Sequence, residues 1–277
     1  MQTQSAKAAA FAALHERQSA FLIPNPWDAG TARILTVLGF EALATTSAGL
    51  AFALGRRDGR GAVTRDETLA NARAIVDATE LPVAADLENG FGHAPETVAQ
   101  TIRLAAERAG LVGGSIEDST GDPERPIYDF SHAVERIVAA VEAARSLPFR
   151  FMLAARAEHF LHGGTDLDET IRRLQAYEAA GADVLYAPGL PSKDAIRTVC
   201  ASLKKPVNVL MAARGATWSL AELQALGVRR VSLGSGLSRA ALGAFVRAAR
   251  ELRETGTCEF ARDLLPFEEA NDLVESR

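Results

Sequence analysis

The chain has 277 residues, of which 48% are hydrophobic and 23% charged, and its formal net charge at pH 7 is -5. This ordinary globular composition excludes collagen, coiled coil and intrinsic disorder, and an acidic balance without a basic stretch argues against nucleic-acid binding. No apolar run reaches the ~18 residues of a membrane helix. The first residues carry no secretory pattern, and two cysteines give no disulfide framework. We therefore expect a cytoplasmic protein with neither a membrane nor a nucleic-acid partner.

A short β-rich run followed by an amphipathic helical stretch recurs along the chain, and glycines such as Gly39, Gly181 and Gly227 end several of the helices. The predicted strands are Ala20–Pro24, Glu41–Thr46, Leu81–Glu88, Val112–Glu117, Phe149–Arg156, Asp183–Ala187, Pro206–Met211 and Arg229–Leu233. The predicted helices are Asp28–Leu38, Arg65–Ala78, Pro95–Ala109, Ser131–Arg145, Asp166–Ala180, Lys193–Leu203, Ser219–Leu226 and Ser238–Arg253. A Gly-rich loop is expected between the second strand and the helix that follows it.

Eight βα units predict a (β/α)8 (TIM) barrel, whereas the alternative, a doubly wound sheet, usually has five or six strands. No linker or composition break divides the chain. We expect residues 1–255 to form one barrel domain and residues 256–277 to be a C-terminal helical extension, free to pack against a partner subunit.

Acidic residues gather where the third and fourth predicted strands end. Asp86 and Glu88 are two residues apart and therefore share a face of the strand, and Glu117 ends the neighbouring strand. Adjacent carboxylates repel each other, and a divalent cation relieves that repulsion. Oxygen ligands without nearby His or Cys favour Mg²⁺ or Mn²⁺. The alternative is that these acids are solvated loop residues or helix caps.

Other strand ends carry residues suited to binding an anion. Arg156 ends the fifth strand and suits bidentate capture of a carboxylate or phosphonate, or else forms a structural ion pair with the barrel acids. The small residues from Thr45 to Gly49 offer hydroxyls and backbone N–H groups to an anion. The alternative is that this segment is an ordinary transition from a strand to a loop. Asp58 adds an acid in the same loop, and Trp27 offers an aromatic wall after the first strand.

The chain resembles the isocitrate lyase/phosphoenolpyruvate mutase superfamily from Phe21 to about Arg253. The segments that carry the resemblance are 25–29 (NPWDA), 46–49 (TSAG), 54–58 (LGRRD), 86–92 (DLENGFG), 115–119 (SIEDS) and 155–158 (ARAE). The resemblance implies a (β/α)8 barrel that binds Mg²⁺ and 2-oxo acids or related carboxylates and reacts through an enolate-type species. It also implies a homo-oligomer, a tetramer or a dimer, in which a C-terminal helix is exchanged between neighbours.

The resemblance implies a role for each site residue. Asp86 would bind the metal directly, and Glu88, Glu117 and Asp58 would hold it through water. The substrate-binding residues would be Trp27, Thr46, Ser47, Ala48, Asp86 and Arg156. The catalytic residues would be Arg156, Glu117 and Asp58, with Arg156 balancing negative charge.

The loop after the fourth strand departs from the family pattern. The lyases of the family carry a Lys-Cys-Gly-His type sequence there, and the mutases a Lys and an Asn, whereas this chain has Thr120 to Tyr128 without Lys, Cys or Asn. We expect a Mg²⁺-dependent C–C lyase. The alternatives are phosphonomutase or phosphonopyruvate hydrolase chemistry at a C–P bond, and a 2-oxo acid binding protein with little catalysis. Glu124, Arg125, Tyr128 and Glu158 stay open as proton-transfer groups, and residues 119–130 as a gating loop.

Overall fold

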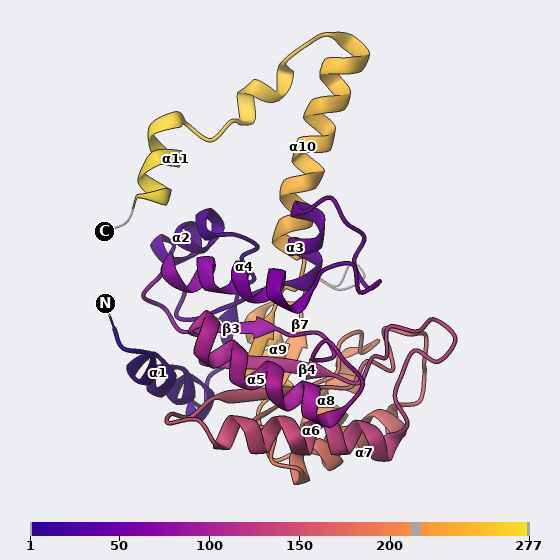
Figure 1. The fold of residues 1–277 in the computed structure, drawn as a ribbon. Coiled ribbons are helices and arrows are strands. Elements are labelled where there is room, and N and C mark those ends of the chain that lie inside the picture. The colour runs from indigo at the N-terminus through magenta and orange to yellow at the C-terminus, as the bar shows by residue number, and fades with distance from the viewer. Residues whose placement is uncertain (1, 212–216, 276–277) are drawn as a thin grey trace.

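The computed structural model describes residues 2–211 and 217–275 of the chain. Its centre is a barrel of eight parallel strands in the order β1-β8-β7-β6-β5-β4-β3-β2 (Figure 1). The strands are β1 (Phe21–Ile23), β2 (Leu43–Ala44), β3 (Val83–Asp86), β4 (Gly113–Glu117), β5 (Met152–Arg156), β6 (Val184–Tyr186), β7 (Val207–Leu210) and β8 (Arg230–Ser232). A hydrogen bond of 3.1 Å from Ala44 N–H to Pro24 O joins the segments of β1 and β2. The predicted TIM barrel is thus confirmed, and the doubly wound sheet is excluded.

The helices are α1 (Gln4–Glu16), α2 (Ala29–Val37), α3 (Ser47–Ala53), α4 (Arg65–Asp77), α5 (Pro95–Ala109), α6 (Phe130–Arg145), α7 (Leu167–Ala179), α8 (Lys193–Ala201), α9 (Leu220–Ala225), α10 (Gly236–Thr255) and α11 (Phe267–Val274), with a 3-10 helix η1 (Glu259–Asp263). Helices α2 to α9 surround the barrel, whereas α1 closes one end of its interior and α10 and α11 extend beyond it (Figure 1). One apolar cluster fills the space between strands and helices, and a second, smaller cluster fills the lower barrel interior. None of the helices in the described part of the chain has the length and apolar character needed to cross a membrane.

Two helices lie where the sequence predicted none. Helix α1 packs Phe11 and Leu14 into the barrel interior, where a Cβ on Gly113 would come within 2.8 Å of the Phe11 ring. Helix α3 occupies the expected Gly-rich loop, and it begins there because the Thr46 hydroxyl accepts the N–H of Gly49 as an N-cap. Strand β2 is correspondingly shorter than the predicted strand Glu41–Thr46.

The C-terminal elements form an arm outside the barrel. Helix α10 projects away from the barrel end, and the chain then turns back through η1 and α11 to α2 (Figure 1). Arg33 on α2 donates to the carbonyl of Val274 at 3.0 Å, which ties α11 to this helix. Phe245 on α10 and Phe267 on α11 remain 70% and 78% exposed. The division between a barrel domain, 1–255, and an extension, 256–277, stays a prediction.

Candidate active site at the barrel mouth

The centre of the site is the Arg156 guanidinium at the end of β5. Its Nη1 lies 2.9 Å from Oδ1 of Asp86, its Nη2 3.2 Å from Oε2 of Glu117 and its Nε 2.8 Å from Oε1 of Glu158. The carboxyl ends of parallel strands meet at one end of a barrel, so acids that are distant in sequence come together there. Arg156 therefore forms the ion pairs that were one of its two predicted roles. Its side chain also borders the two cavities described below, so it remains accessible to a ligand.

Asp86 is anchored by the loop that follows β2. Its Oδ2 accepts the Ser47 hydroxyl at 2.8 Å and the Ser47 N–H at 3.3 Å, while Thr45 Oγ1 accepts the N–H of Asp86. Ser47 is the first residue of α3, so the capped start of this helix fixes the orientation of the carboxylate. The arrangement brings the predicted metal ligand and the predicted anion-binding loop into direct contact.

Asp58 and Glu88 are acids at the same mouth with no ion-pair partner among the described residues. Burial raises the pKa of Glu88 to about 7, with further contributions from the negative charges of Asp86 and Asp58. Burial and the charge of Asp86 also raise the pKa of Asp58. Glu88 has a left-handed backbone, with φ of 48°, which is uncommon for a non-glycine residue and marks a constrained turn after β3. The two carboxylates thus share an environment in which negative charge is in excess.

Glu117 and Glu158 are held still more firmly. Burial raises the pKa of both carboxyls, although Arg156 opposes the shift. The N–H of Glu158 donates to Oδ1 of buried Asp118 at 2.8 Å. Oδ2 of Asp118 accepts the Tyr177 hydroxyl at 2.7 Å and Nη1 of Arg173 at 3.2 Å. Because Asp118 is fully engaged in these bonds, it positions Glu158 and does not itself face the cavity.

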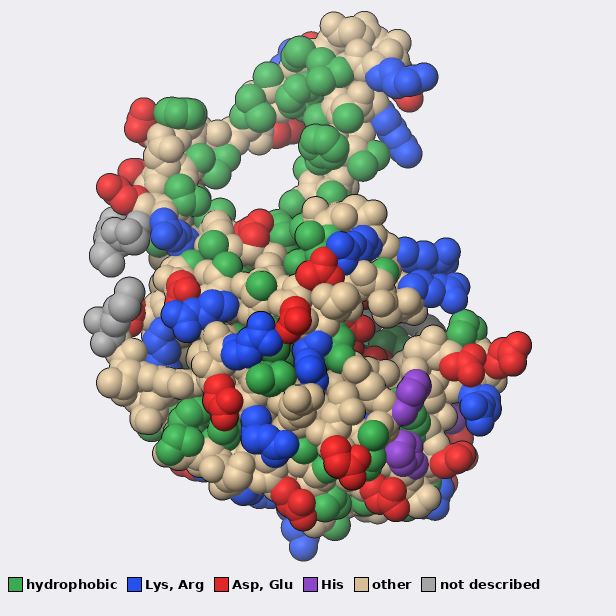
Figure 2. Space-filling model, viewed as in Figure 1, with side chains coloured by type: hydrophobic (Ala, Val, Ile, Leu, Met, Phe, Trp, Pro, Cys, Tyr) green, Lys and Arg blue, Asp and Glu red, His purple; other side chains and the backbone are tan. Residues whose placement is uncertain are grey.

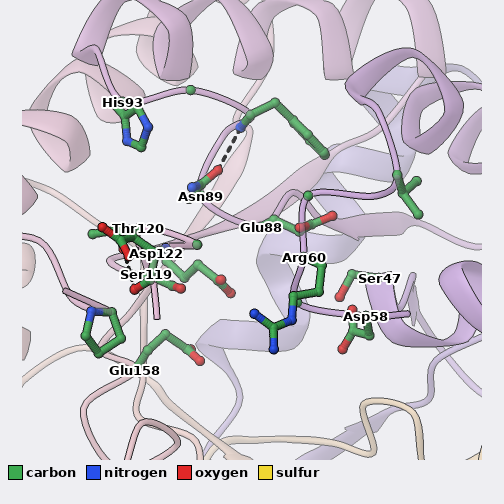
Figure 3. A pocket seen from close by; sticks show the side chains of 18 of the residues that line it. Ser47, Asp58, Arg60, Glu88, Asn89, His93, Ser119, Thr120, Asp122 and Glu158 are labelled. Carbon is green, nitrogen blue, oxygen red and sulfur yellow. Dashed lines mark hydrogen bonds between the residues drawn. The ribbon is translucent and has the colours of Figure 1, made fainter. Parts of the chain in front are cut away.

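Two connected cavities open beside these residues. A cleft of about 1280 Å³ lies above the strand ends, where Asp58 and Arg60 line one side and Ser119, Thr120 and Glu158 the other (Figure 3). A smaller cavity of about 150 Å³ continues into the barrel. The residues common to both cavities are Ser47, Asp58, Arg156 and Leu161.

The remaining predicted substrate residues lie close to the smaller cavity. Thr46 and Ala48 line it, and Thr46 also serves as the cap of α3. Trp27 lines neither cavity. It packs behind α3, where a Cβ on Gly49 would lie 3.0 Å from Trp27 Cβ and 2.6 Å from Thr46 Cγ2. Gly49 is therefore required for the close approach of these segments.

The carboxylates have the chemistry of a site for a hydrated divalent cation. Among residues 2–211 and 217–275, no three His, Cys, Asp or Glu side chains are grouped as a set of direct metal ligands. The donors at the mouth are carboxylate oxygens, which suit Mg²⁺, an ion that usually keeps several waters. Burial, followed by the charges of neighbouring carboxylates, raises the pKa of both Asp58 and Glu88 at this mouth. The chemistry of the donor set is therefore compatible with a hydrated divalent cation.

A polar row inside the barrel includes three residues that the sequence analysis did not identify, Tyr186, Asn208 and Arg230. Strand register joins Glu117 to Arg156, Arg156 to Tyr186, Tyr186 to Asn208 and Asn208 to Arg230. Asn208 accepts the Nε of Arg230 at 2.9 Å and donates to Ser232 Oγ at 3.0 Å. The signal in the sequence was the alternation of Asn208 with Val207 and Val209, which places a polar side chain on the inner face.

The loop after β4 is folded over the cleft. Thr120 N–H donates to Pro126 O, and Tyr128 N–H donates to Asp118 O, which closes a hairpin-like turn. Tyr128 lies within hydrogen-bond distance of His93, with 2.6 Å between its hydroxyl and Nδ1. This contact links the loop after β4 to the loop after β3.

Comparisons with known proteins agree on one family. The family model described as phosphoenolpyruvate phosphomutase matches residues 11–253. A crystal structure of a Burkholderia cenocepacia J2315 protein described as a putative lyase/mutase is 58% identical, with a TM-score of 0.95, over 99% of this chain and 97% of that one. The 2,3-dimethylmalate lyase of Eubacterium barkeri is 32% identical over 91% of this chain and 88% of its own length. A phosphonopyruvate hydrolase in complex with oxalate and Mg²⁺ is 25% identical, with a TM-score of 0.85, over 98% of this chain and 95% of that one.

Proposed function

The chain belongs to the phosphoenolpyruvate phosphomutase family, within the isocitrate lyase/PEP mutase superfamily, and on this premise we propose that it is a Mg²⁺-dependent lyase. The proposed reaction cleaves or forms a C–C bond in a 2-oxo acid or a related carboxylate, through an enolate-type intermediate. The observation that supports this most directly is the Arg156 cluster with Asp86, Glu117 and Glu158, which borders a cavity at the barrel mouth.

The metal would be held by acids at or just after the ends of β3 and β4 and in the loop after α3. Asp86 is the direct ligand in this proposal, and Glu88, Glu117 and Asp58 hold the ion through water; Mn²⁺ is the alternative ion. A divalent cation held by these residues would supply electrostatic stabilisation of charge that develops on the substrate keto oxygen. Ser47 keeps the Asp86 carboxylate oriented through its hydroxyl, at 2.8 Å.

The substrate carboxylate would lie against the start of α3. The backbone of Thr46, Ser47 and Ala48 would bind it, since the Ser47 hydroxyl donates to Asp86, and Trp27 supports this segment from behind. Arg156 balances the negative charge. Glu117 and Asp58 complete the proposed catalytic set, because burial raises the pKa of both carboxyls and makes each a stronger proton acceptor than an exposed acid.

Ligand-dependent melting tests the site directly. Oxalate mimics the enolate of pyruvate, and a ligand at a hundred times its Kd stabilises a fold by about 2.7 kcal/mol. For a chain of this size that corresponds to a rise in Tm of roughly 5–10 °C, because each kcal/mol shifts Tm by about 2–4 °C. We expect the rise to need both Mg²⁺ and oxalate and to disappear in Asp86→Asn. The control is Asp77→Asn, because Asp77 is an exposed acid that pairs with Arg73.

A substrate panel then separates the candidate reactions. NMR of mixtures with 2,3-dimethylmalate, 2-methylisocitrate, oxaloacetate or phosphonopyruvate reports which bond breaks. Cleavage of phosphonopyruvate alone would replace the lyase by a phosphonopyruvate hydrolase. Binding of oxalate with Mg²⁺ and no turnover of any acid would indicate a 2-oxo acid binding protein. Absence of any oxalate effect in the parent protein would refute the metal-dependent site.

A homo-oligomer is part of the proposal. Apolar side chains of α10 and the arm beyond it are exposed, as Figure 2 shows along the projecting arm. They are Leu242, Phe245, Val246, Leu252, Leu264, Leu265 and Phe267. A contiguous apolar surface of this kind indicates an interface. We assign it to a second copy of the chain, with α10 as the exchanged helix.

A further inference from the structure

We propose that Arg230, inside the barrel below the Arg156 cluster, binds a second acidic group of the substrate. The protein would then favour 2-oxo dicarboxylic acids over 2-oxo monocarboxylic acids. This inference rests on the proposed function, since it assumes that a 2-oxo acid occupies the mouth of the barrel.

Arg230 is a cation placed inside the barrel. It is the first residue of β8, its register partner on β1 is Phe21, and only 6% of its surface is exposed. Nε donates to Oδ1 of Asn208 at 2.9 Å. The residue lines the cavity of about 150 Å³ that continues down from the Arg156 cluster.

The guanidinium lacks a counter-charge. Among the described residues no carboxylate forms an ion pair with Arg230, and Nε–Asn208 is its one hydrogen bond. Other buried arginines differ: Arg156 pairs with three acids, Arg173 pairs with Asp118 and Glu169, and Arg136 donates to the carbonyls of Asn89, Gly92 and His93. An unpaired buried charge is costly to a fold. A residue kept in that state, with free donors beside a cavity, is suited to an anion that arrives from outside.

The cavity suits a small acid. At about 30 Å³ per water-sized group, 150 Å³ holds roughly five such groups. Besides Arg230, its lining includes the hydroxyls of Ser232 and Ser235. Asp86 and Arg156 border the same cavity, so an acid bound at the mouth extends toward Arg230. A second carboxylate of the substrate would then accept the free guanidinium donors.

Binding of two acids that differ in reach tests the proposal. The full-length protein with Mg²⁺ is titrated calorimetrically with oxalate, which occupies the mouth alone, and with 3,3-difluorooxaloacetate, which adds a more distant carboxylate. A hydrogen bond to a charged group is worth roughly ten- to a hundredfold in Kd. We expect Arg230→Met to raise the Kd of 3,3-difluorooxaloacetate by that factor and to leave the Kd of oxalate within about threefold of the parent value.

The matched control is Arg229→Met. Arg229 is the adjacent residue, and strand alternation places its side chain on the outer face of β8. We expect this variant to bind both acids as the parent does. Arg230→Gln removes the charge while keeping a polar group for Asn208, and it takes the place of Arg230→Met if the latter does not fold.

The outcomes are distinguishable. Equal affinities of parent and Arg230 variants for 3,3-difluorooxaloacetate overturn this inference and leave the proposed function intact. An equal loss of affinity for oxalate and 3,3-difluorooxaloacetate overturns the inference as well, because Arg230 would then support the structure of the whole site. A parent protein that binds neither acid refutes the proposed function itself. A selective loss of affinity for 3,3-difluorooxaloacetate supports the proposal that Arg230 binds a second carboxylate.

Discussion

Arg156 and Asp86 end strands that are not neighbours, β5 and β3, yet Nη1 of Arg156 lies 2.9 Å from Oδ1 of Asp86. The same guanidinium reaches Glu117 at the end of β4, the strand between them, at 3.2 Å. One cation thus links the ends of three consecutive strands. Its removal leaves buried carboxylates facing one another, which makes this cluster a determinant of stability as well as of function.

Replacement of Arg156 tests that role. Without divalent metal, Arg156→Gln leaves Asp86, Glu117 and Glu158 unpaired and should lower the free energy of unfolding by about 3–5 kcal/mol, as for other broken buried pairs. Urea denaturation measures the loss, and added Mg²⁺ should restore part of it. Arg73→Gln, which breaks the exposed pair with Asp77, should change stability by no more than about 0.5 kcal/mol. Equal stability of the two variants would show that the cluster contributes little.

Gly49 tests the close packing behind Ser47. A methyl group on Gly49 would lie 2.6 Å from Thr46 Cγ2, so Gly49→Ala must shift the start of α3. We expect a loss of about 1–3 kcal/mol in unfolding free energy together with weaker oxalate binding. Gly30→Ala is the control, because its nearest neighbour would be the Asp28 carboxylate at 3.6 Å. Thermal melts in which both variants match the parent would contradict the packing argument.

His15 makes stability depend on pH. Burial, with the nearby charge of Arg230, lowers its pKa to about 3, whereas an unfolded chain has a His pKa near 6.5. Below about pH 6.5, His15 is therefore protonated in the unfolded state but stays neutral in the folded state. The stabilising contribution of neutral His15 is complete above that pH and is lost as pH falls toward 3, by up to about 1.4 kcal/mol per pH unit.

Denaturation at a series of pH values checks this expectation. His15→Leu should flatten the decline in stability between about pH 6 and 4 relative to the parent. His132→Gln, which removes a partly exposed histidine, is the control. Parallel pH profiles for the parent and His15→Leu would rule out the proposed origin.

Substitution of Phe245 tests the proposed interface between copies of the chain. Phe245 lies on α10 with 70% of its surface exposed, and Phe245→Asp places a charge in the proposed contact between copies. We expect light scattering to report a smaller species for this variant than for the parent. Arg247→Asp, two residues away and so on the other side of the helix, should retain the parent mass. A parent protein that is monomeric at micromolar concentration would exclude the interface.

The sequence alone determined the barrel and the acids at its mouth. Hydrophobic runs alternating with amphipathic stretches are local signals, and a parallel sheet must bring Asp86, Glu117 and Arg156 to one end. The family followed from short motifs around the same residues. Helix α1 and the short helix α3 were not predicted, because the former is stabilised by long-range burial of Phe11 and the latter by its cap and by packing against Trp27.

The tertiary structure alone decided which polar side chains share the barrel interior. Glu117, Arg156, Tyr186, Asn208 and Arg230 are consecutive register partners across five strands, although more than a hundred residues separate the first from the last. Local sequence does not encode the register of a closed barrel, since it emerges when all the strands close together. For the same reason Arg230, which follows another arginine in the chain, is recognisable as an unpaired cation beside the cavity only in the folded protein.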